Sequence, residues 1–347
     1  MKTPYDIPQK EKESILLKEL NKLTKLHSEN CPEYAKLLHL FYENQVEAKS
    51  LNTIPYLPVN LFKTHNLLSV SQDKIFKVLK SSGTTSIKPS KIFLDASTAT
   101  RQSAALVAIM THFLGNERLP MLILDKPNVI TDRESYSARG AAILGMMSFG
   151  RDFCYAFDEN MQLNKEAILV WLKKHETKKL LLFGMTYIVW KYFLSVMEPL
   201  HLTNGVLIHT GGWKKMEEEA VTNALFKEKL FQITGITECH NFYGMVEQVG
   251  SVFVECEKGY LHAPFTSDVI VRETKTWKET DGIGVIQVLS TLPTSYPGHS
   301  LLTEDLSLIK GVDDCACGRK GKYFEVLGRV PKAEIRGCSD TFTGRAL

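Results

Sequence analysis

The sequence predicts a large α/β protein in which parallel βα units are followed by a strand-rich later part. Two observations support this fold class. From about residue 97 to residue 232, helical patterns alternate with short apolar runs, which is typical of strands joined by crossover helices. After residue 239 the pattern changes to short strands and turns. With 347 residues and 44% hydrophobic side chains, the chain is long enough for one large domain or two smaller ones.

The expected elements follow from the spacing of apolar residues. Two helices come first, at 9–27 and 33–46, and Pro55 and Pro58 then predict an extended connection. In the alternating part, helices are expected at 97–115, 138–148, 163–174, 185–197 and 217–232. The runs between them are apolar on both faces, as strands covered by helices are, and lie at 120–125, 151–157, 179–183 and 205–209. Later strands are expected at 251–256, 267–273, 284–290, 306–309 and 323–328.

Charge and composition exclude several classes of protein. The net charge of +3 is spread along the chain and gives no reason to expect a nucleic acid partner. The N-terminus lacks the apolar stretch of a signal peptide, and no segment is a clean run of about 20 apolar residues, so we expect no integral membrane protein. Seven scattered cysteines do not suggest a disulfide framework. A reducing cytoplasmic location is therefore expected.

A run of small, hydroxyl-rich residues precedes the alternating part. Its backbone N–H groups and hydroxyls can approach a phosphate chain without bulky side chains between them, and Lys88 and Lys91 would add positive charge. A solvent loop ending in a helix N-cap is the alternative. The run is not a Walker motif, because it has one glycine and its lysines come late. The candidate phosphate-binding residues are Ser81, Ser82, Gly83, Thr84, Thr85 and Ser86.

Four short motifs follow in order along the chain. The first, Gly211-Gly212-Trp213, follows an apolar strand, as a ligand-binding turn at the carboxyl end of a parallel strand would. Each motif alone is weak evidence, because a lone Gly-Gly is usually a turn and a lone Asp is usually a solvated charge. Their joint order is more specific. The other three are Asn241-Phe242-Tyr243-Gly244-Met245-Val246-Glu247, Thr303-Glu304-Asp305-Leu306 and Gly328-Arg329.

Together these motifs resemble the adenylate-forming superfamily of acyl-CoA synthetases and luciferases. SSGTTS resembles its phosphate loop, YGMVE its tyrosine, magnesium and adenine motif, and TEDL its ribose-binding motif. With IPYLPVNLFK, HTGGWKK, FEVLGRV and RGCS, the chain most closely resembles the acyl-protein synthetases of bacterial luminescence operons, also called long-chain-fatty-acid luciferin-component ligases. Phenylacetate-CoA ligases are next nearest. The resemblance implies an adenylation domain at 51–329, N-terminal helices at 1–50 that belong to the same body as this domain, and a short flexible tail at 330–347.

The resemblance implies ATP and Mg²⁺ as cofactors. The small residues of the loop would hold the β- and γ-phosphates, assisted by Lys88 or Lys91. Glu247 would help to hold Mg²⁺, a hard cation that prefers oxygen ligands. Asp305 would accept hydrogen bonds from the ribose hydroxyls, and Arg329 would lie near the ribose or phosphate. The adenine would be lined by Gly211, Gly212, Trp213 and Tyr243, within motifs that also contain Asn241, Gly244 and Met245.

Three departures from the superfamily pattern bear on this interpretation. Pro89 stands where the family has a lysine, which leaves the phosphate-binding lysine open, and Val246 stands where a threonine is usual. Only 18 residues follow Arg329, so we expect the usual C-terminal lid domain to be missing. Acyl-protein synthetases share this shortness and carry a cysteine near the C-terminus that receives the acyl group as a thioester. Cys338 matches that cysteine; an unremarkable tail thiol is the alternative.

Four residues form a candidate structural zinc site that does not depend on the resemblance. Cys315 and Cys317 are a close thiol pair, and Cys256 lies six residues before His262. Three thiolates and one imidazole make a closed tetrahedral zinc site. Reduced free cysteines beside an ordinary core histidine are the alternative.

The resemblance implies an enzyme that converts a carboxylic acid, expected to be a fatty acid, into acyl-AMP. The acyl group would pass to Cys338 and then to a partner, such as an acyl reductase or a carrier protein. Two alternatives stay open: an acyl- or aryl-CoA ligase, and a non-catalytic module that binds a nucleotide or an acyl group.

Overall fold

A computed structural model of the chain describes residues 3–81, 89–130, 138–213 and 220–330. The chain divides into two compact units. Unit 1 is built mainly from Met1–Ser81, Ile87–His112 and Gly244–Glu334, and unit 2 from Phe113–Tyr243. The expected domain boundaries at residues 50 and 329 stay a prediction. Within the described residues, no helix is long and apolar enough to cross a membrane.

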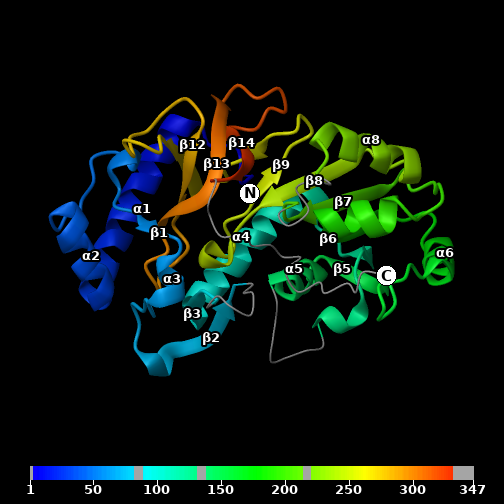
Figure 1. Cartoon of the computed structure of the whole chain (residues 1–347), viewed down its shortest axis with the longest axis horizontal. Coiled ribbons are helices and arrows are strands. Elements are labelled where there is room, and N and C mark those ends of the chain that lie inside the picture. The colour runs from blue at the N-terminus through cyan, green and yellow to red at the C-terminus, as the bar shows by residue number, and fades with distance from the viewer. Residues whose placement is uncertain (1–2, 82–88, 131–137, 214–219, 331–347) are drawn as a thin grey trace. The chain divides into compact units, whose positions relative to one another are not determined.

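Unit 2 contains a sheet with the strand order β8-β7-β6-β4-β5, in which every pair of neighbours is parallel (Figure 1). The expected βα units are therefore confirmed. The strands β4, β6 and β7 are buried along their whole length, which explains their continuous apolar sequences. The strand bounds are β4 Leu119–Ile123, β5 Gly150–Tyr155, β6 Leu180–Met185, β7 Gly205–Thr210 and β8 Glu238–Tyr243.

Two strands of this sheet differ from expectation. β5 lies at the edge and exposes Asp152 and Phe153, so the expectation that it is covered on both faces is wrong. β8 was not expected as a strand of the parallel sheet. Its sequence, ECHNFY, mixes polar and apolar residues because only Cys239 and His240 are buried.

The helices of unit 2 show how local sequence sets their ends. α8 begins where the Thr222 hydroxyl accepts a hydrogen bond from Leu225 N–H, and it ends at Gly235, whose φ of 72° favours glycine. The expected start at residue 217 is therefore too early. The expected helix 185–197 is one short helix followed by a π-helical turn, Val189–Leu194. The bounds are α5 Ala138–Met147, α6 Lys165–Lys174, α7 Thr186–Ile188, α8 Asn223–Thr234 and the 3₁₀ turn Pro127–Ile130.

Unit 1 contains the expected strand-rich part. Its sheet has the order β11-β12-β13-β14-β10-β9, with antiparallel neighbours wherever a register is defined, and β1 pairs in parallel with β13. Residues 306–309 lie inside a strand of 13 residues, longer than expected. The bounds are β1 Leu57–Pro58, β9 Phe253–Glu255, β10 Leu261–His262, β11 Ser267–Arg272, β12 Gly284–Ser290, β13 Ser300–Val312 and β14 Lys322–Arg329.

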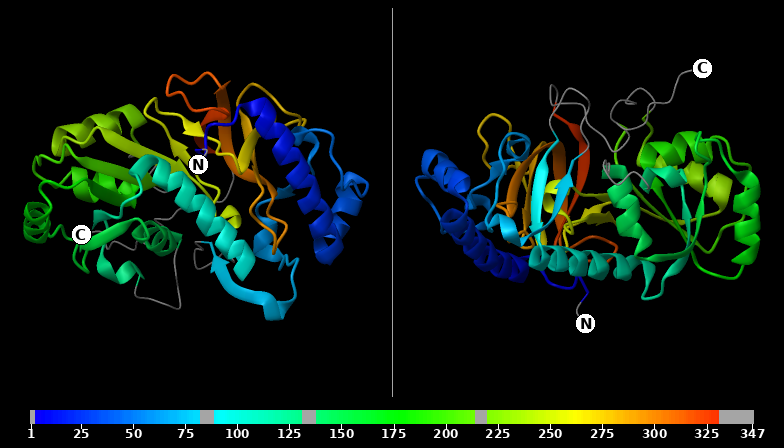
Figure 2. Two further views of the ribbon diagram at one scale, coloured as in Figure 1. Left: turned by 180° about the vertical axis from the view of Figure 1, so that it is seen from behind. Right: turned by 90° about the horizontal axis from the view of Figure 1, so that it is seen from below.

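The N-terminal helices α1 (Gln9–Asn30) and α2 (Pro32–Tyr42) pack on unit 1. Leu16, Leu20 and Leu23 repeat at helical spacing on α1 and share a core cluster with Ile270 and Leu289 of the sheet. Figure 2 shows α1 lying along these strands. The remaining helical elements of this unit are α3 Leu61–Thr64, the first part of α4 Ala96–Leu114 and the 3₁₀ turns Leu51–Thr53, Gln72–Lys74 and Val246–Gln248.

A two-stranded hairpin, β2 (Ile75–Lys80) and β3 (Lys91–Asp95), was not expected from the sequence. The residues that join its strands include the candidate phosphate loop, whose Ser82, Gly83, Thr84, Thr85, Ser86 and Lys88 lie outside the described residues. The residues that flank this loop are hydrogen-bonded to each other: Ser81 N–H donates to the Ser90 carbonyl at 3.1 Å, and Ser90 N–H donates to the Ser81 hydroxyl at 2.8 Å.

Candidate functional site

The predicted adenine-binding residues of unit 2 lie at the carboxyl ends of two adjacent parallel strands. Gly211, Gly212 and Trp213 directly follow β7, and Asn241 and Tyr243 lie in the last half of β8. The neighbouring ends are linked by a hydrogen bond of 2.9 Å from the Thr210 hydroxyl to the Phe242 carbonyl. Gly211 has a φ of 86°, which allows the chain to turn out of the strand. The structure thus brings these motifs together at the carboxyl ends of the strands, where ligands bind in open α/β folds.

Aromatic side chains surround Trp213. The ring of Tyr187 meets it edge-on at 6.3 Å, and the ring of Trp190 does so at 6.1 Å. Trp190 in turn stacks on Phe226 at 6.2 Å. Tyr187 and Trp190 were missed as candidates, although their aromatic-rich segment MTYIVWKYF follows an apolar strand directly. Flat aromatic surfaces of this kind suit a planar or apolar ligand.

His209 lies buried at the end of β7 and is neutral. Its Nδ1 is 2.9 Å from the Thr186 hydroxyl, which donates to the Thr210 carbonyl at 3.2 Å. Burial lowers the pKa of His209 to about 3. Nε2 has no hydrogen-bond partner among the described residues.

In unit 1, the structure brings Asp305 and Arg329 together. They are register partners in the antiparallel pair β13–β14, and Arg329 Nε lies 3.5 Å from Asp305 Oδ1. The Arg329 guanidinium also lies 3.9 Å from the Glu304 carboxylate. Both Asp305 and Arg329 stay about one-fifth exposed, at 20% and 22%. A carboxylate held beside a cation, yet open to solvent, can still accept hydrogen bonds from a ligand.

Gly244, Met245 and Glu247 follow β8 and enter a 3₁₀ turn. The Glu247 side chain is 7% exposed, and its backbone carbonyl accepts a hydrogen bond of 2.9 Å from the Tyr296 hydroxyl. Met245 packs against the core cluster that contains Tyr296. The turn is therefore held by the core on one side. Cys338, like Lys88, lies outside the described residues.

The four candidate zinc ligands, which we call the metal-ligand cluster, come together in unit 1. The ligand atoms of Cys256, His262, Cys315 and Cys317 all lie within 4.8 Å of one another. The Cys256 and Cys315 Sγ atoms are 3.9 Å apart, and Cys317 Sγ is 3.3 Å from His262 Nε2. Two thiolates bound to one tetrahedral zinc ion at about 2.3 Å would lie about 3.8 Å apart. The side chains therefore fit such an ion.

The electrostatics of the cluster follow from burial and from Arg319. Burial raises the pKa of Cys256, raises that of Cys315 to about 12 and lowers that of His262 to about 4. Burial also opposes ionisation of Cys317, but hydrogen bonds from Arg319, Cys315 and Cys256 together outweigh it and leave the pKa of this thiol below its usual value. Neutral thiols packed this closely stabilise one another only weakly. A divalent cation would stabilise them as thiolates, and the neutral imidazole is already the form that binds metal.

The first residues of the chain pack on the metal-ligand cluster. Phe265 N–H donates to the Pro4 carbonyl at 2.8 Å, and Lys320 N–H donates to the Tyr5 carbonyl at 2.8 Å. The Tyr5 ring meets the ring of His262 edge-on at 6.1 Å. Sequence reasoning missed this role for the N-terminus, because nothing in residues 3–8 shows which distant loop they pair with.

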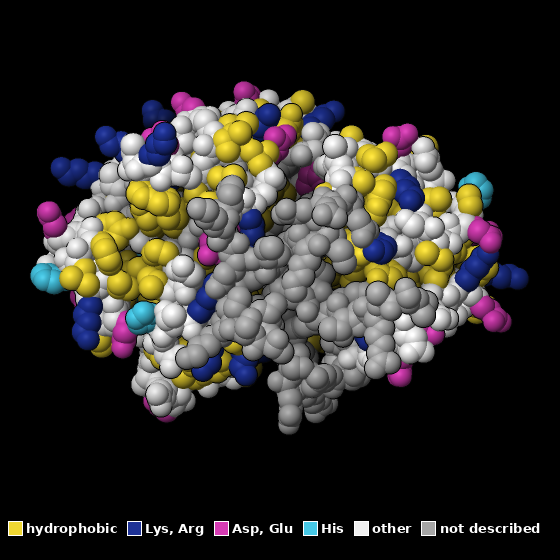
Figure 3. Space-filling view, viewed as in Figure 1, with side chains coloured by type: hydrophobic (Ala, Val, Ile, Leu, Met, Phe, Trp, Pro, Cys, Tyr) yellow, Lys and Arg dark blue, Asp and Glu magenta, His cyan; other side chains and the backbone are white. Residues whose placement is uncertain are grey.

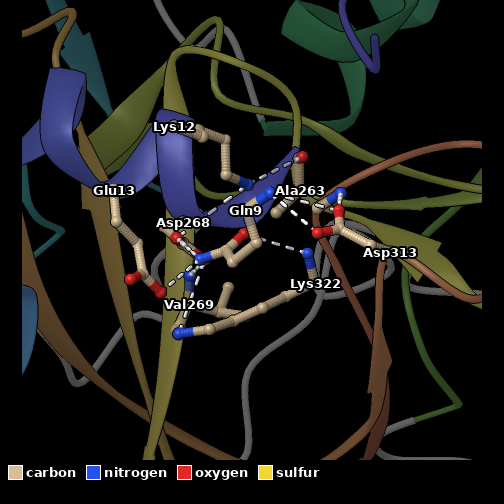
Figure 4. Close-up of polar contacts among 9 residues, drawn as sticks. Gln9, Lys12, Glu13, Ala263, Asp268, Val269, Asp313 and Lys322 are labelled. Atoms are coloured by element: carbon tan, nitrogen blue, oxygen red, sulfur yellow. Dashed lines mark hydrogen bonds and ion pairs between the residues drawn. The ribbon is translucent and has the colours of Figure 1, made fainter. Parts of the chain in front are cut away.

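Polar contacts at the start of α1 continue this attachment (Figure 4). Gln9 N–H donates to the Asp313 carboxylate at 3.0 and 3.1 Å, and Gln9 Nε2 donates to Asp268 Oδ2 at 2.6 Å. The ammonium groups of Lys12 and Lys322 lie 3.9 and 3.8 Å from the Asp268 carboxylate. Asp268 and Lys12 are 0% and 2% exposed. A buried carboxylate is thus compensated by two cations from distant parts of the chain.

Comparison with known proteins identifies relatives of the whole chain. The model of the acyl-protein synthetase family, LuxE, matches residues 1–346. A long-chain-fatty-acid–luciferin-component ligase of Vibrio harveyi is 22% identical, over 99% of this chain and 93% of the relative. The protein of the same name from Aliivibrio fischeri is 24% identical, over 85% of this chain and 80% of the relative.

A solved structure of 2-hydroxyisobutyryl-CoA ligase, in complex with 2-HIB-AMP and CoA, superposes with a TM-score of 0.70 at 16% identity. The match covers 98% of this chain and 79% of the ligase, and it confirms the adenylate-forming fold. The family resemblance drawn from the sequence motifs is confirmed by the match to the family model. The chain belongs to the acyl-protein synthetase family, LuxE.

Proposed function

We propose that this protein is an ATP-dependent acyl-protein synthetase that converts a fatty carboxylic acid into acyl-AMP and transfers the acyl group to a protein thiol. The observation that carries the proposal is the family match, which extends over residues 1–346 and so includes every nucleotide motif and Cys338. The likeness to a ligase solved with an acyl-adenylate supports the same first step.

In the first step, a carboxylate oxygen attacks the α-phosphate of ATP, and pyrophosphate leaves with the electrons of the broken P–O bond. The attacking carboxylate is already ionised near neutral pH, so the step needs charge neutralisation rather than a general base. Lys88 or Lys91 is proposed to approach the phosphates. Glu247 would hold Mg²⁺, which supplies positive charge at the phosphate oxygens when bound. These side chains supply the neutralisation.

The nucleotide itself is proposed to bind through the residues of the sequence motifs. Asp305 would accept hydrogen bonds from the ribose hydroxyls, and Arg329, 3.5 Å away, would orient that carboxylate. The loop residues Ser81 to Ser86 would donate to the β- and γ-phosphates. The adenine would be lined by Gly211, Gly212, Trp213 and Tyr243, within motifs that also include Asn241, Gly244 and Met245.

In the second step, the thiolate of Cys338 attacks the carbonyl carbon of acyl-AMP, and AMP leaves with the electron pair of the acyl–oxygen bond. The product is a thioester that a partner protein, such as an acyl reductase or a carrier protein, would receive. Transfer to CoA is the second candidate, because the structural relative with a TM-score of 0.70 was solved with CoA.

Pyrophosphate exchange and acyl labelling separate these functions. With radioactive pyrophosphate and a panel of fatty and aryl acids, we expect acid-dependent formation of labelled ATP. Cys338→Ser should keep this exchange and lose labelling of the protein by radioactive fatty acid, whereas Cys154→Ser, a half-buried thiol in β5, should keep both. A Cys338→Ser protein that still forms a hydroxylamine-labile acyl-protein refutes the acceptor role. Exchange with none of the acids refutes the enzyme, and CoA-dependent acyl release by the serine variant favours the CoA ligase.

We also propose that the metal-ligand cluster holds one structural Zn²⁺. The donor set of three thiols and one imidazole, and the 3.9 Å separation of two Sγ atoms, support a closed tetrahedral site. Metal analysis of the purified protein should give about one zinc per chain. A content well below one, under conditions that preserve the fold, would contradict the proposal.

A reducing, cytoplasmic location is proposed as well. Six cysteines of the described residues are free, and four of them are buried, as expected where thiols stay reduced. Alkylation of the protein under native cell lysis should find these thiols unoxidised.

A further inference from the structure

Tyr296 is a buried tyrosine whose hydroxyl contacts the turn that carries Glu247. It is 0% exposed, and its ring packs in a core cluster of unit 1, edge-on to Phe62 at 6.0 Å. The hydroxyl donates a hydrogen bond of 2.9 Å to the Glu247 carbonyl. A carbonyl oxygen can only accept, so the hydroxyl proton points at Glu247. None of the motifs found in the sequence includes Tyr296.

A second buried side chain supports the direction of this hydrogen bond. Gln102 of α4 is 2% exposed, and its Nε2 donates to the Tyr296 hydroxyl at 3.3 Å. The hydroxyl oxygen therefore accepts from α4 while its proton goes to Glu247. α4 also lies close to the chain just beyond the turn, because a Cβ atom at Gly250 would lie 2.6 Å from the Gln102 carbonyl oxygen. The two side chains thus connect α4 to the turn.

Gln248 holds the turn from a second direction. Its side chain is 1% exposed, and its Nε2 donates to the Val288 carbonyl of β12 at 3.0 Å and to the Gly298 carbonyl at 2.8 Å. Tyr296 therefore fixes the carbonyl of Glu247, and Gln248 fixes the residue that follows. Together these contacts restrict ψ of Glu247 and so limit where its carboxylate can lie.

We propose that Tyr296 is a positioning residue that orients the Glu247 carboxylate toward Mg²⁺. The proposal rests on the proposed function, in which Glu247 helps to hold the metal. This side chain is 7% exposed and offers the oxygen ligands that Mg²⁺ prefers. Hydrogen bonds around a ligand raise the affinity for metal, because less order has to be imposed when the metal binds. A residue needed only for packing could be phenylalanine, so the hydroxyl is the group to test.

Nucleotide-dependent binding of Mn²⁺ tests the proposal without relying on turnover. Mn²⁺ replaces Mg²⁺ as a paramagnetic probe, and electron paramagnetic resonance measures free Mn²⁺ in the presence of α,β-methylene-ATP. We expect Tyr296→Phe to raise the Kd of Mn²⁺ about tenfold, and Gln102→Met to raise it by less. The affinity for the analogue without metal, measured by calorimetry in EDTA, should be unchanged because the nucleotide motifs are intact.

Tyr34→Phe is the matched control. Tyr34 is 1% exposed in the same core cluster, and its hydroxyl lies 3.4 Å from His299 Nε2 rather than against the turn. This variant should keep the wild-type Kd for Mn²⁺. On the face drawn in Figure 3, most acidic side chains (magenta) are separated from one another by neutral or basic groups. Binding of Mn²⁺ to such isolated carboxylates should be weak and should not depend on the nucleotide.

A double-mutant cycle with Glu247→Gln separates positioning from general stability. Glu247→Gln removes the charged ligand and should itself raise the Kd of Mn²⁺. In that background, Tyr296→Phe should add no further loss, since no carboxylate remains to be oriented. A full tenfold loss added on top of that of Glu247→Gln would overturn the proposal.

Four other results would also overturn it. They are an unchanged Kd in Tyr296→Phe, an equal loss in Tyr34→Phe, an equal loss of metal-free nucleotide binding, and a wild type without nucleotide-dependent Mn²⁺ binding. Pyrophosphate exchange reports separately on the proposed function. Exchange should need about tenfold more Mg²⁺ in Tyr296→Phe, with an unchanged KM for the acid. Its absence in the wild type with every acid refutes the enzyme, whereas the Mn²⁺ measurement still decides the role of Tyr296.

Discussion

The buried carboxylate of Asp268 gives a stability prediction that the structure makes specific. It receives a hydrogen bond from Gln9 Nε2 at 2.6 Å and one from Val269 N–H at 2.8 Å, and two ammonium groups lie just below 4 Å away, at 3.9 Å for Lys12 and 3.8 Å for Lys322. Burial alone would raise the pKa of Asp268. The two lysines and the hydrogen bonds outweigh burial and keep that pKa below its usual value.

The two charge partners should not be equally costly to remove. Asp268→Asn removes the ion-pair partner that Lys12 and Lys322 share, and Lys12 is only 2% exposed; breaking a buried pair from one side costs about 3–5 kcal/mol. Lys12→Met leaves Asp268 with Lys322 and both hydrogen bonds. It removes an ionic contact of 3.9 Å and the hydrogen bond of 3.2 Å from Lys12 Nζ to the Ala263 carbonyl, so we expect a loss of about 1–2 kcal/mol.

Equilibrium urea unfolding, followed by far-ultraviolet circular dichroism at pH 7, measures both losses if the slope m stays constant. Asp281→Asn and Lys25→Met are matched controls at exposed positions and should change the free energy of unfolding by less than about 0.5 kcal/mol. A loss for Lys12→Met equal to or greater than that for Asp268→Asn would refute the reasoning, because the carboxylate would then not be the centre of the network.

Three other predictions concern pH, nucleotide and metal. Burial lowers the pKa of His27 to about 3, so below pH 6.5 the unfolded state binds a proton that the folded state does not. The urea midpoint should therefore be constant from pH 8 to 7 and fall at lower pH. His27 should contribute about 1 kcal/mol of lost unfolding free energy per pH unit. A midpoint that stays constant down to pH 5 contradicts this. Arg329→Gln should lower kcat/KM for ATP about tenfold with little change in Tm, as measured by pyrophosphate exchange; an unchanged kcat/KM removes Arg329 from the nucleotide site. Cys317→Ala should lose zinc and lower the Tm by about 5 °C or more, whereas Cys154→Ala should keep the zinc.

Some of the fold could be predicted because burial leaves a simple mark on the sequence. β4, β6 and β7 are buried on both faces and read as continuous apolar runs, and α1 repeats its leucines at helical spacing. The metal-ligand cluster could be predicted because thiols and an imidazole at short spacings have few other common purposes. Asp305 and Arg329 were expected in one nucleotide site, and the register of β13 with β14 places them side by side.

Other features could not be predicted because they depend on partners far away in the chain. β8 reads as polar because only Cys239 and His240 of its six residues are buried, and β2 alternates weakly because four of its six residues are exposed. The burial of Lys12 is decided by Asp268, more than 250 residues later. A local pattern predicts lysine as a surface residue, and only the assembled sheet supplies the anion that allows its burial.

The metal-ligand cluster and the Asp268 network hold the same loop from two sides. The loop between β13 and β14 supplies Cys315 and Cys317 to the cluster, and in the same loop Asp313 accepts from Gln9. The Tyr5 ring lies against His262, so the chain segment that starts at residue 3 contacts the cluster before it reaches the network. Metal binding would order the loop and thereby lower the entropy cost of docking the N-terminus. The two sets of contacts are therefore expected to be coupled, and their effects on stability should not be additive.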